Sequence, residues 1–417
     1  MERNSDIDYA TSANRWALIF CGLWPDHEVK KPNRIYNLSM FALMNILNGA
    51  TCVPQFVDLY FVWGDWDEML ENVMCSLCLT LMQVKVICVW RKTENLGILH
   101  EELYKDWQTQ AVDDANKNNE DLLLRRSLMK SSAWMGRALC LMMTITMYAT
   151  CVLFLPRPYV RSLILKLPPE ERRFPYETEY LVAWVKESPY YEILYMSQII
   201  GGVLCLTGNF ATDSSIAVIM VHLCGQFKIL TNDWRKFCDS ATGRDDSRVN
   251  GREGNDGRAN LRRELKILVE RHLHLIKLAE VIEEAFNQMV LFQLVVSSTL
   301  IGIIVFHFIQ SLEHADVWSF GLLVFYLISQ TLFVFVYCLG GQLLINESQA
   351  VGEAIYMLEW YNLPPSIAKD LMIVMIRSKT GLTISAGKFC AMNYETFSSV
   401  SFQAIYFHFR LHQNSVH

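Results

Sequence analysis

Charged residues are scarce in this sequence: they make up 19% of its 417 residues, whereas hydrophobic residues make up 52%. Soluble domains usually carry about 25% charged residues. The apolar residues are gathered into runs, and about 20 apolar residues are what an α-helix needs to cross the hydrocarbon core of a bilayer. The shortage of charge therefore argues against a soluble enzyme and for an integral membrane protein.

Motifs for enzymatic chemistry are missing as well. The sequence has no phosphate-binding glycine loop, no His-Glu-x-x-His and no nucleophile elbow. Most of its twelve cysteines lie inside apolar runs, where cysteine behaves as a small hydrophobic residue. Cys75 and Cys78 form a Cys-x-x-Cys in such a run, without a second pair. We expect no catalytic activity, no cofactor, no metal site and no nucleic-acid partner.

A secretory signal peptide and a second domain are not expected either. Residues 1–15 are polar and mixed in charge, so the first membrane helix is expected to act as its own signal. The polar segments 111–121 and 241–260 are linkers by composition and cannot bury a core. We find no internal repeat, and we expect a single membrane domain over residues 1–417.

Six apolar runs are long enough to span a bilayer, and a seventh is weaker. They cover residues 38–61, 69–90, 133–155, 190–221, 289–309 and 317–339, with 394–409 as the weak run. The fold class predicted is therefore an all-α membrane protein with seven transmembrane helices.

The loops between the runs differ sharply in positive charge. Of the 37 Lys and Arg residues, 28 lie on the side of the N-terminus and 7 on the opposite side. Loops rich in Lys and Arg stay in the cytosol. The N-terminus is thus predicted to be cytosolic and, after seven crossings, the C-terminus extracellular.

Charge inside the runs is costly. Lys85, Arg137 and Asp213 are charged residues in such positions. One interpretation is that each reaches the inner interface or a helix partner, Lys85 by extending its stem toward water. The alternative is an ion pair involved in gating, formed by Asp213 with either Arg137 or Lys85.

A heptad pattern precedes the fifth run. Apolar residues recur at alternating spacings of four and three, which is typical of a helix packed along one seam. The seam residues are Leu261, Leu265, Leu268, His272, Leu275, Ala279, Ile282 and Phe286. Residues 347–360 form a second amphipathic helix, with Ile355 on its apolar face. Segments 261–288 and 341–392 are thus predicted to form a cytosolic anchor bundle. Its subunit contacts are expected at Leu268, His272, Leu275 and Ile355.

The C-terminal third resembles a known family. Its residues Gly341-Gln-Leu-Leu-Ile-Asn-Glu-Ser348, Ala354-Ile-Tyr356, Trp360, Ala386-Gly-Lys-Phe389 and Glu395-Thr-Phe397 resemble, in order and spacing, the C-terminal signature of insect odorant receptors. The resemblance implies an odorant-gated cation channel in the plasma membrane of sensory-neuron dendrites. It also implies a tetramer of tuned subunits with a common co-receptor. The short loop before the fifth run indicates a tuned subunit.

The resemblance further implies that the last helix, about 393–412, lines the pore, with Tyr406 and Phe407 as candidates. Arg410 and His412 depart from the family tail, because apolar residues are expected there. Two alternatives stay open: a gustatory receptor of the same superfamily and a small-molecule transporter. The latter should show repeats and interrupted helices, which the sequence lacks.

The resemblance places the ligand site in the outer half of the helix bundle. The ligand is expected to be a small, neutral, hydrophobic volatile. Position and chemistry suggest candidate contacts on four runs: Val73, Leu77, Thr146, Tyr148, Tyr191, Tyr195, Met196, Phe325 and Tyr326.

Overall fold

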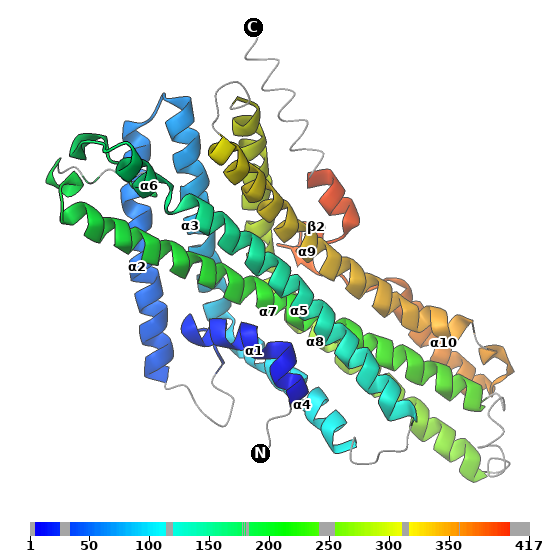
Figure 1. Ribbon diagram of the computed structural model, residues 1–417. Helices are drawn as coiled ribbons and strands as arrows, with labels where there is room; N and C mark the ends of the chain where they lie inside the picture. The colour runs from blue at the N-terminus through cyan, green and yellow to red at the C-terminus, as the bar shows by residue number, and fades with distance from the viewer. Residues whose placement is uncertain are drawn as a thin grey trace, which may run out of the picture.

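The computed structural model describes residues 5–25, 34–113, 120–176, 178, 180, 183–241, 255–310, 317–357 and 359–400. Its elements are long helices joined by short connections (Figure 1). They are α1 (Ser5–Phe20), α2 (Arg34–Phe61), α3 (Trp66–Arg91), α4 (Thr93–Asp113), α5 (Glu120–Phe154), α6 (Arg157–Ile164), α7 (Tyr190–Ala241), α8 (Asn255–Gln310), α9 (Val317–Tyr356) and α10 (Pro365–Lys379). Three short 3-10 helices (Pro169–Glu171, Ala183–Lys186, Trp360–Asn362) and two strands, β1 (Ser385–Ala386) and β2 (Cys390–Ala391), complete the described part.

Six of these helices are long and apolar enough to cross a membrane: α2, α3, α5, α7, α8 and α9. They contain the six strong runs of the sequence, so the chain is a multi-pass membrane protein. Of the weak seventh run, only the beginning is described, where residues 394–400 are helical. The proposed pore residues Tyr406, Phe407 and Arg410 lie outside the described residues, as does most of each polar linker.

Helix α2 buries polar side chains and exposes apolar ones, the reverse of a helix at the surface of a soluble protein. Its buried positions include Asn48, Gln55 and Asp58, whereas Val53 and Tyr60 are exposed. In water this arrangement would be unfavourable, because apolar surface would be solvated and polar groups buried. In a bilayer it is favourable, because lipid contacts the apolar face and the polar side chains bond within the bundle.

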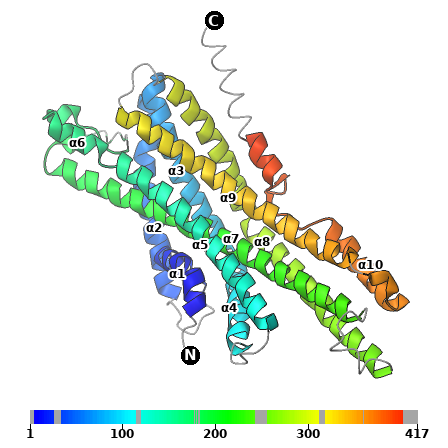
Figure 2. The same cartoon turned by 45° about the vertical axis from the view of Figure 1, so that its right-hand side comes forward.

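Helices α7, α8 and α9 run beyond the bilayer. Helix α7 has 52 residues, which corresponds to about 78 Å, more than twice the roughly 30 Å of hydrocarbon. It packs against α1, α3, α5, α8 and α9 and lies at the centre of the bundle (Figure 2). Helix α6 lies at one end of the molecule, and α4 and α10 lie toward the other (Figure 1). We call these the α6 end and the α10 end.

The predicted seam is part of one continuous helix, α8, which joins it to the fifth membrane run as expected. Its side chains are buried inside a single chain: Leu275 is 0% exposed and His272 5%, with the His272 ring edge-on to Phe227. Ile355 on α9 is also 0% exposed. These three side chains are enclosed by helices of their own chain. A direct subunit contact is therefore left to Leu268, which is half-buried, and to other surface residues.

Candidate functional site

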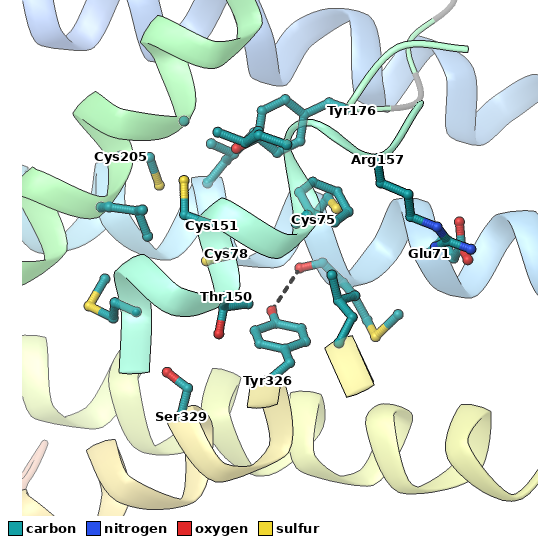
Figure 3. A pocket seen from close by; sticks show the side chains of 18 of the residues that line it. Glu71, Cys75, Cys78, Thr150, Cys151, Arg157, Tyr176, Cys205, Tyr326 and Ser329 are labelled. Atoms are coloured by element: carbon teal, nitrogen blue, oxygen red, sulfur yellow. Dashed lines mark hydrogen bonds between the residues drawn. The ribbon is translucent and has the colours of Figure 1, made fainter. Parts of the chain in front are cut away.

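The α6 half of the bundle surrounds a partly open cavity of about 1010 Å³. Helices α3, α5, α7, α8 and α9 supply its walls, and residues 156–165, which include α6, border one side of it. Figure 3 shows how side chains from these helices converge on it. The volume is at the upper end of the roughly 300–1,000 Å³ that small-molecule sites occupy.

The walls are mainly apolar and carry several thiols. Met74, Leu323 and Phe333 are apolar contributors from α3 and α9. Cys78, Cys151 and Cys205 reach the cavity from α3, α5 and α7, and Figure 3 shows them near one another. All twelve cysteines lie in the described part of the chain, and none forms a disulfide. No group of His, Cys, Asp and Glu able to hold a metal occurs among the described residues.

A buried ion pair forms one polar end of the cavity. Lys85 Nζ on α3 lies 2.7 Å from Asp213 Oδ1 and 2.9 Å from Oδ2 on α7, and donates to Asn209 Oδ1 at 3.2 Å. Tyr337 on α9 donates its hydroxyl to Asp213 Oδ1 at 2.6 Å. The side chains of Lys85 and Asp213 are 1% and 0% exposed. Paired and hydrogen-bonded in this way, two opposite charges can be held in a low-dielectric interior.

This pairing selects one of the alternatives that the sequence left open. Asp213 pairs with Lys85, whereas Arg137 presents an exposed side chain. Of the two options given for Lys85, the inner interface or a helix partner, the structure shows the helix partner, because its ammonium group is buried between α3 and α7. Whether the pair takes part in gating stays a prediction.

A second set of polar side chains in the cavity consists of two amides and one hydroxyl joined by hydrogen bonds. Gln293 on α8 donates from Nε2 to Ser297 Oγ at 2.6 Å, and Ser297 donates to Gln330 Oε1 on α9 at 3.1 Å. Gln293 and Gln330 both line the cavity. The chain of bonds links α8 to α9 and orients both amides.

Polar residues of α3, of α6 and of the segment between α6 and α7 border the cavity at the α6 end. Glu71 on α3 lies beside Arg157 in Figure 3, and Tyr176 approaches Gly202 of α7. A Cβ atom at Gly202 would lie 2.5 Å from the Tyr176 hydroxyl. Glycine is thus required for this close approach, and a larger residue would displace Tyr176 from the cavity wall.

Of the nine predicted ligand contacts, Tyr326 lines the cavity, where its hydroxyl donates to the Met74 carbonyl oxygen at 3.4 Å. Its neighbour Phe325 points away and is 42% exposed. On α3 the lining residues include Met74, Cys75 and Cys78, whereas Val73 and Leu77 are not among them, so a ligand contact at these two positions stays a prediction.

The remaining candidates also lie outside the cavity lining. Thr146 donates to the backbone of its own helix, and Tyr148 lies within hydrogen-bond distance of Thr207 Oγ1. Tyr191 and Tyr195 are buried in an aromatic cluster with Tyr159 and Phe174 at the α6 end. Met196 is 55% exposed.

Sequence reasoning missed Gln293 and Gln330 and the contribution of residues 156–165. A signal was present for part of it: Gln293 and Gln330 are uncharged polar residues inside two apolar runs. Such residues usually face another helix or a cavity, since lipid cannot bond them.

Comparison with known proteins agrees with this architecture. A sequence model of the family described as "7tm Odorant receptor" matches residues 65–404. Odorant receptor 13a of Drosophila melanogaster is 23% identical over 91% of this chain and 89% of its own length. Odorant receptor 82a of the same species is 21% identical over 77% of each chain. The Odorant receptor coreceptor of Anopheles gambiae is 30% identical, but over 36% of this chain and 32% of its own length.

Among solved structures, the insect olfactory receptor OR5 from Machilis hrabei in complex with eugenol superposes with a TM-score of 0.79. Its sequence identity is 14%, and the match covers 98% of this chain and 100% of that chain. The likeness shows a shared fold. The long matches to tuned receptors agree with a tuned subunit, and the family match excludes an enzyme. The chain belongs to the insect odorant receptor family.

Proposed function

We propose that this chain is the ligand-binding subunit of an odorant-gated cation channel. A small, neutral volatile binds in the cavity between α3, α5, α7, α8 and α9. The observation that carries the proposal is the cavity of about 1010 Å³, with apolar walls and a few convergent polar groups. Lys85 and Asp213 neutralise each other, so this end of the cavity favours an uncharged ligand over an ion.

The proposed orientation places the α6 end outside the cell and the α10 end in the cytosol. The excess of Lys and Arg on the side of the N-terminus supports it. Volatiles then reach the cavity from the extracellular side. The helix that begins at residues 394–400 is proposed to continue as a seventh span and to line the pore with Tyr406, Phe407 and Arg410.

The proposed partner is the common co-receptor, with which the chain forms a heteromeric, tetrameric channel in the dendrite membrane of sensory neurons. Exposed apolar residues at the α10 end support a subunit contact there. Ile373 and Ile376 of α10 are 65% and 68% exposed, and Met372 on the same helix is 43% exposed. On a part of the molecule outside the lipid, such a patch is more stable when covered by another subunit.

The proposal is tested by whole-cell recording from cells that express this chain with or without the co-receptor, at matched surface levels. We expect volatile-evoked cation currents with the co-receptor and none without it. Four Arg410 side chains around one axis would repel each other and passing cations, by about 2 kcal/mol for each pair 8 Å apart at an effective dielectric of 20. Equal currents from the chain alone would contradict this assignment. Ligand accumulation without current would favour a transporter.

A further inference from the structure

Among the described residues that line the cavity, Gln293 Oε1 and His307 Nδ1 are buried polar atoms without a hydrogen-bond partner, and Gln293 Oε1 is the carbonyl acceptor of the two. Gln293 is 3% exposed and lines the cavity. Its Nε2 is already bonded to Ser297 Oγ at 2.6 Å. The carbonyl oxygen is therefore the unsatisfied atom of a side chain that borders the cavity.

An unsatisfied acceptor at such a site discriminates among ligands. Leaving a buried polar group without a partner costs about 1–3 kcal/mol, and only a donor removes that cost. Ethers, ketones, esters and hydrocarbons have no hydrogen to donate. A hydroxyl group has one, and it fits a site that a single water molecule would otherwise fill.

Groups that can donate a hydrogen bond to the hydroxyl oxygen of a ligand also line the cavity. Gln330 lines the cavity, and its Oε1 is occupied by Ser297, which leaves its Nε2 as the donor of that amide. Lys85 also lines the cavity, although its ammonium is bonded to Asp213 and Asn209. The apolar side chains of Leu323 and Phe333 offer a surface for the hydrocarbon part of a ligand.

We propose that the ligands of this receptor are volatile alcohols or phenols, whose hydroxyl group donates a hydrogen bond to Gln293 Oε1. The hydrocarbon part then lies along the apolar walls toward the α6 end. This inference rests on the proposed function, since it names the chemical class that the same cavity takes.

The test compares four compounds with an eight-carbon chain: 1-octanol, the methyl ether of 1-octanol, 2-octanone and octane. An aromatic pair, 4-ethylphenol and its methyl ether, is compared in the same way. In cells that express the chain with the co-receptor, each hydroxyl compound should evoke current at a concentration about tenfold lower than its methyl ether, the effect of one hydrogen bond. Gln293→Leu should remove most of that difference.

Gln55→Leu is the matched control. Gln55 on α2 is 0% exposed, and neither of its amide atoms has a hydrogen-bond partner in the described ranges, but it does not line the cavity. The control should keep the preference for hydroxyl compounds. If it loses the preference as Gln293→Leu does, the effect is one of general packing and the inference is overturned.

A binding measurement separates this inference from the channel function. Methyl methanethiosulfonate labels accessible thiols, and labelling of Cys151 in the unmodified purified complex can be followed by mass spectrometry. The alcohols should slow this labelling at lower concentrations than their methyl ethers. Protection without current would leave the inference standing and contradict the proposed channel. Currents or protection with equal potency for alcohols and ethers would overturn the inference and leave the channel function intact. Absence of protection by every compound would also overturn it.

Discussion

The two ends of the molecule use the same long helices in opposite ways. Toward the α10 end, α7, α8 and α9 pack against one another, and Leu275, Leu344 and Ile355 are each 0% exposed. In the α6 half, the same three helices diverge with α3 and α5 around about 1010 Å³ of space. Empty space forgoes the dispersion contacts that stabilise a packed interior. In the proposed function, the packed end contributes stability and the α6 half contributes the ligand site.

Polar residues mark the boundary between the two ends. Lys85, Asp213 and Tyr337 connect α3, α7 and α9 where the cavity stops and close packing begins. Ligand contacts and the packed seam therefore share three helices, and a change at the cavity can be transmitted along rigid elements. The predictions below test each part of this division.

The largest expected effect is loss of the complex between this chain and the co-receptor, caused by a substitution on the surface of the α10 end. Ile373→Glu places a charge on the exposed apolar face of α10, and burial of each such side chain is worth roughly 1.5–3 kcal/mol. We expect the variant to fold but not to co-purify with the co-receptor. Leu123→Glu is the control, because Leu123 on α5 is also well exposed, at 60%. Normal co-purification of Ile373→Glu would exclude α10 from the interface.

A break at the boundary should leave assembly aside and lower the stability of the chain itself. Lys85→Met leaves Asp213 buried without its cation, and we expect a loss of about 3–5 kcal/mol in the free energy of unfolding. Combining it with Asp213→Leu should recover most of this loss, as judged by thermal unfolding in detergent.

The matched control is Lys92→Met, which removes the exposed pair with Glu284, whose side chains are 38% and 63% exposed. Its expected cost is at most about 1 kcal/mol. If both lysine variants behaved alike, the buried pair would have no special role in stability.

Truncation of leucines compares the two ends directly. Leu275→Ala removes a fully buried side chain from the packed end and should cost about 2–5 kcal/mol. Leu322→Ala removes a half-buried side chain that already borders the cavity, and we expect less than about 2 kcal/mol. Similar losses in thermal stability would show that the cavity half is packed as tightly as the seam.

The smallest expected effect is a pH dependence at the packed end. His100 on α4 is 3% exposed beside Trp24, and burial lowers its pKa from 6.5 to about 4. The unfolded chain binds this proton near pH 6.5 and the folded chain near pH 4, so stability falls as pH drops through that window. We expect a loss of about 2 kcal/mol between pH 7 and pH 5. His100→Phe should lack this component; parallel pH curves for the two proteins would contradict it.

Much of the helical framework was predictable, because runs of apolar residues are read directly from the chain. Helices α7 and α9 begin at Tyr190 and Val317, where the runs begin. The continuity of the seam with the fifth run was likewise predicted. Helices α1 and α4 were missed, since neither is apolar enough to be distinguished from a polar loop.

The cavity lining was mostly not predictable, for a geometric reason. Adjacent residues of a helix point about 100° apart, and a helix that is apolar on all sides gives no sign of which face is inward. Val73 was therefore chosen on α3 where Met74 lines the cavity. The partner of Asp213 was equally undetermined, because Lys85 and Arg137 both lie near the same depth and only tertiary packing separates them.

The measurement that tests the central claim most directly is agonist potency in two variants of adjacent aromatic residues on α9. Tyr326 lines the cavity, whereas Phe325 lies outside the lining and is 42% exposed. In complexes with the co-receptor at equal surface levels, Tyr326→Ala should raise the half-maximal agonist concentration at least about tenfold. Phe325→Ala should change it less than about twofold, since an exposed side chain makes no contact with the cavity. Equal shifts in the two variants, or a larger shift for Phe325→Ala, would contradict ligand binding in this cavity.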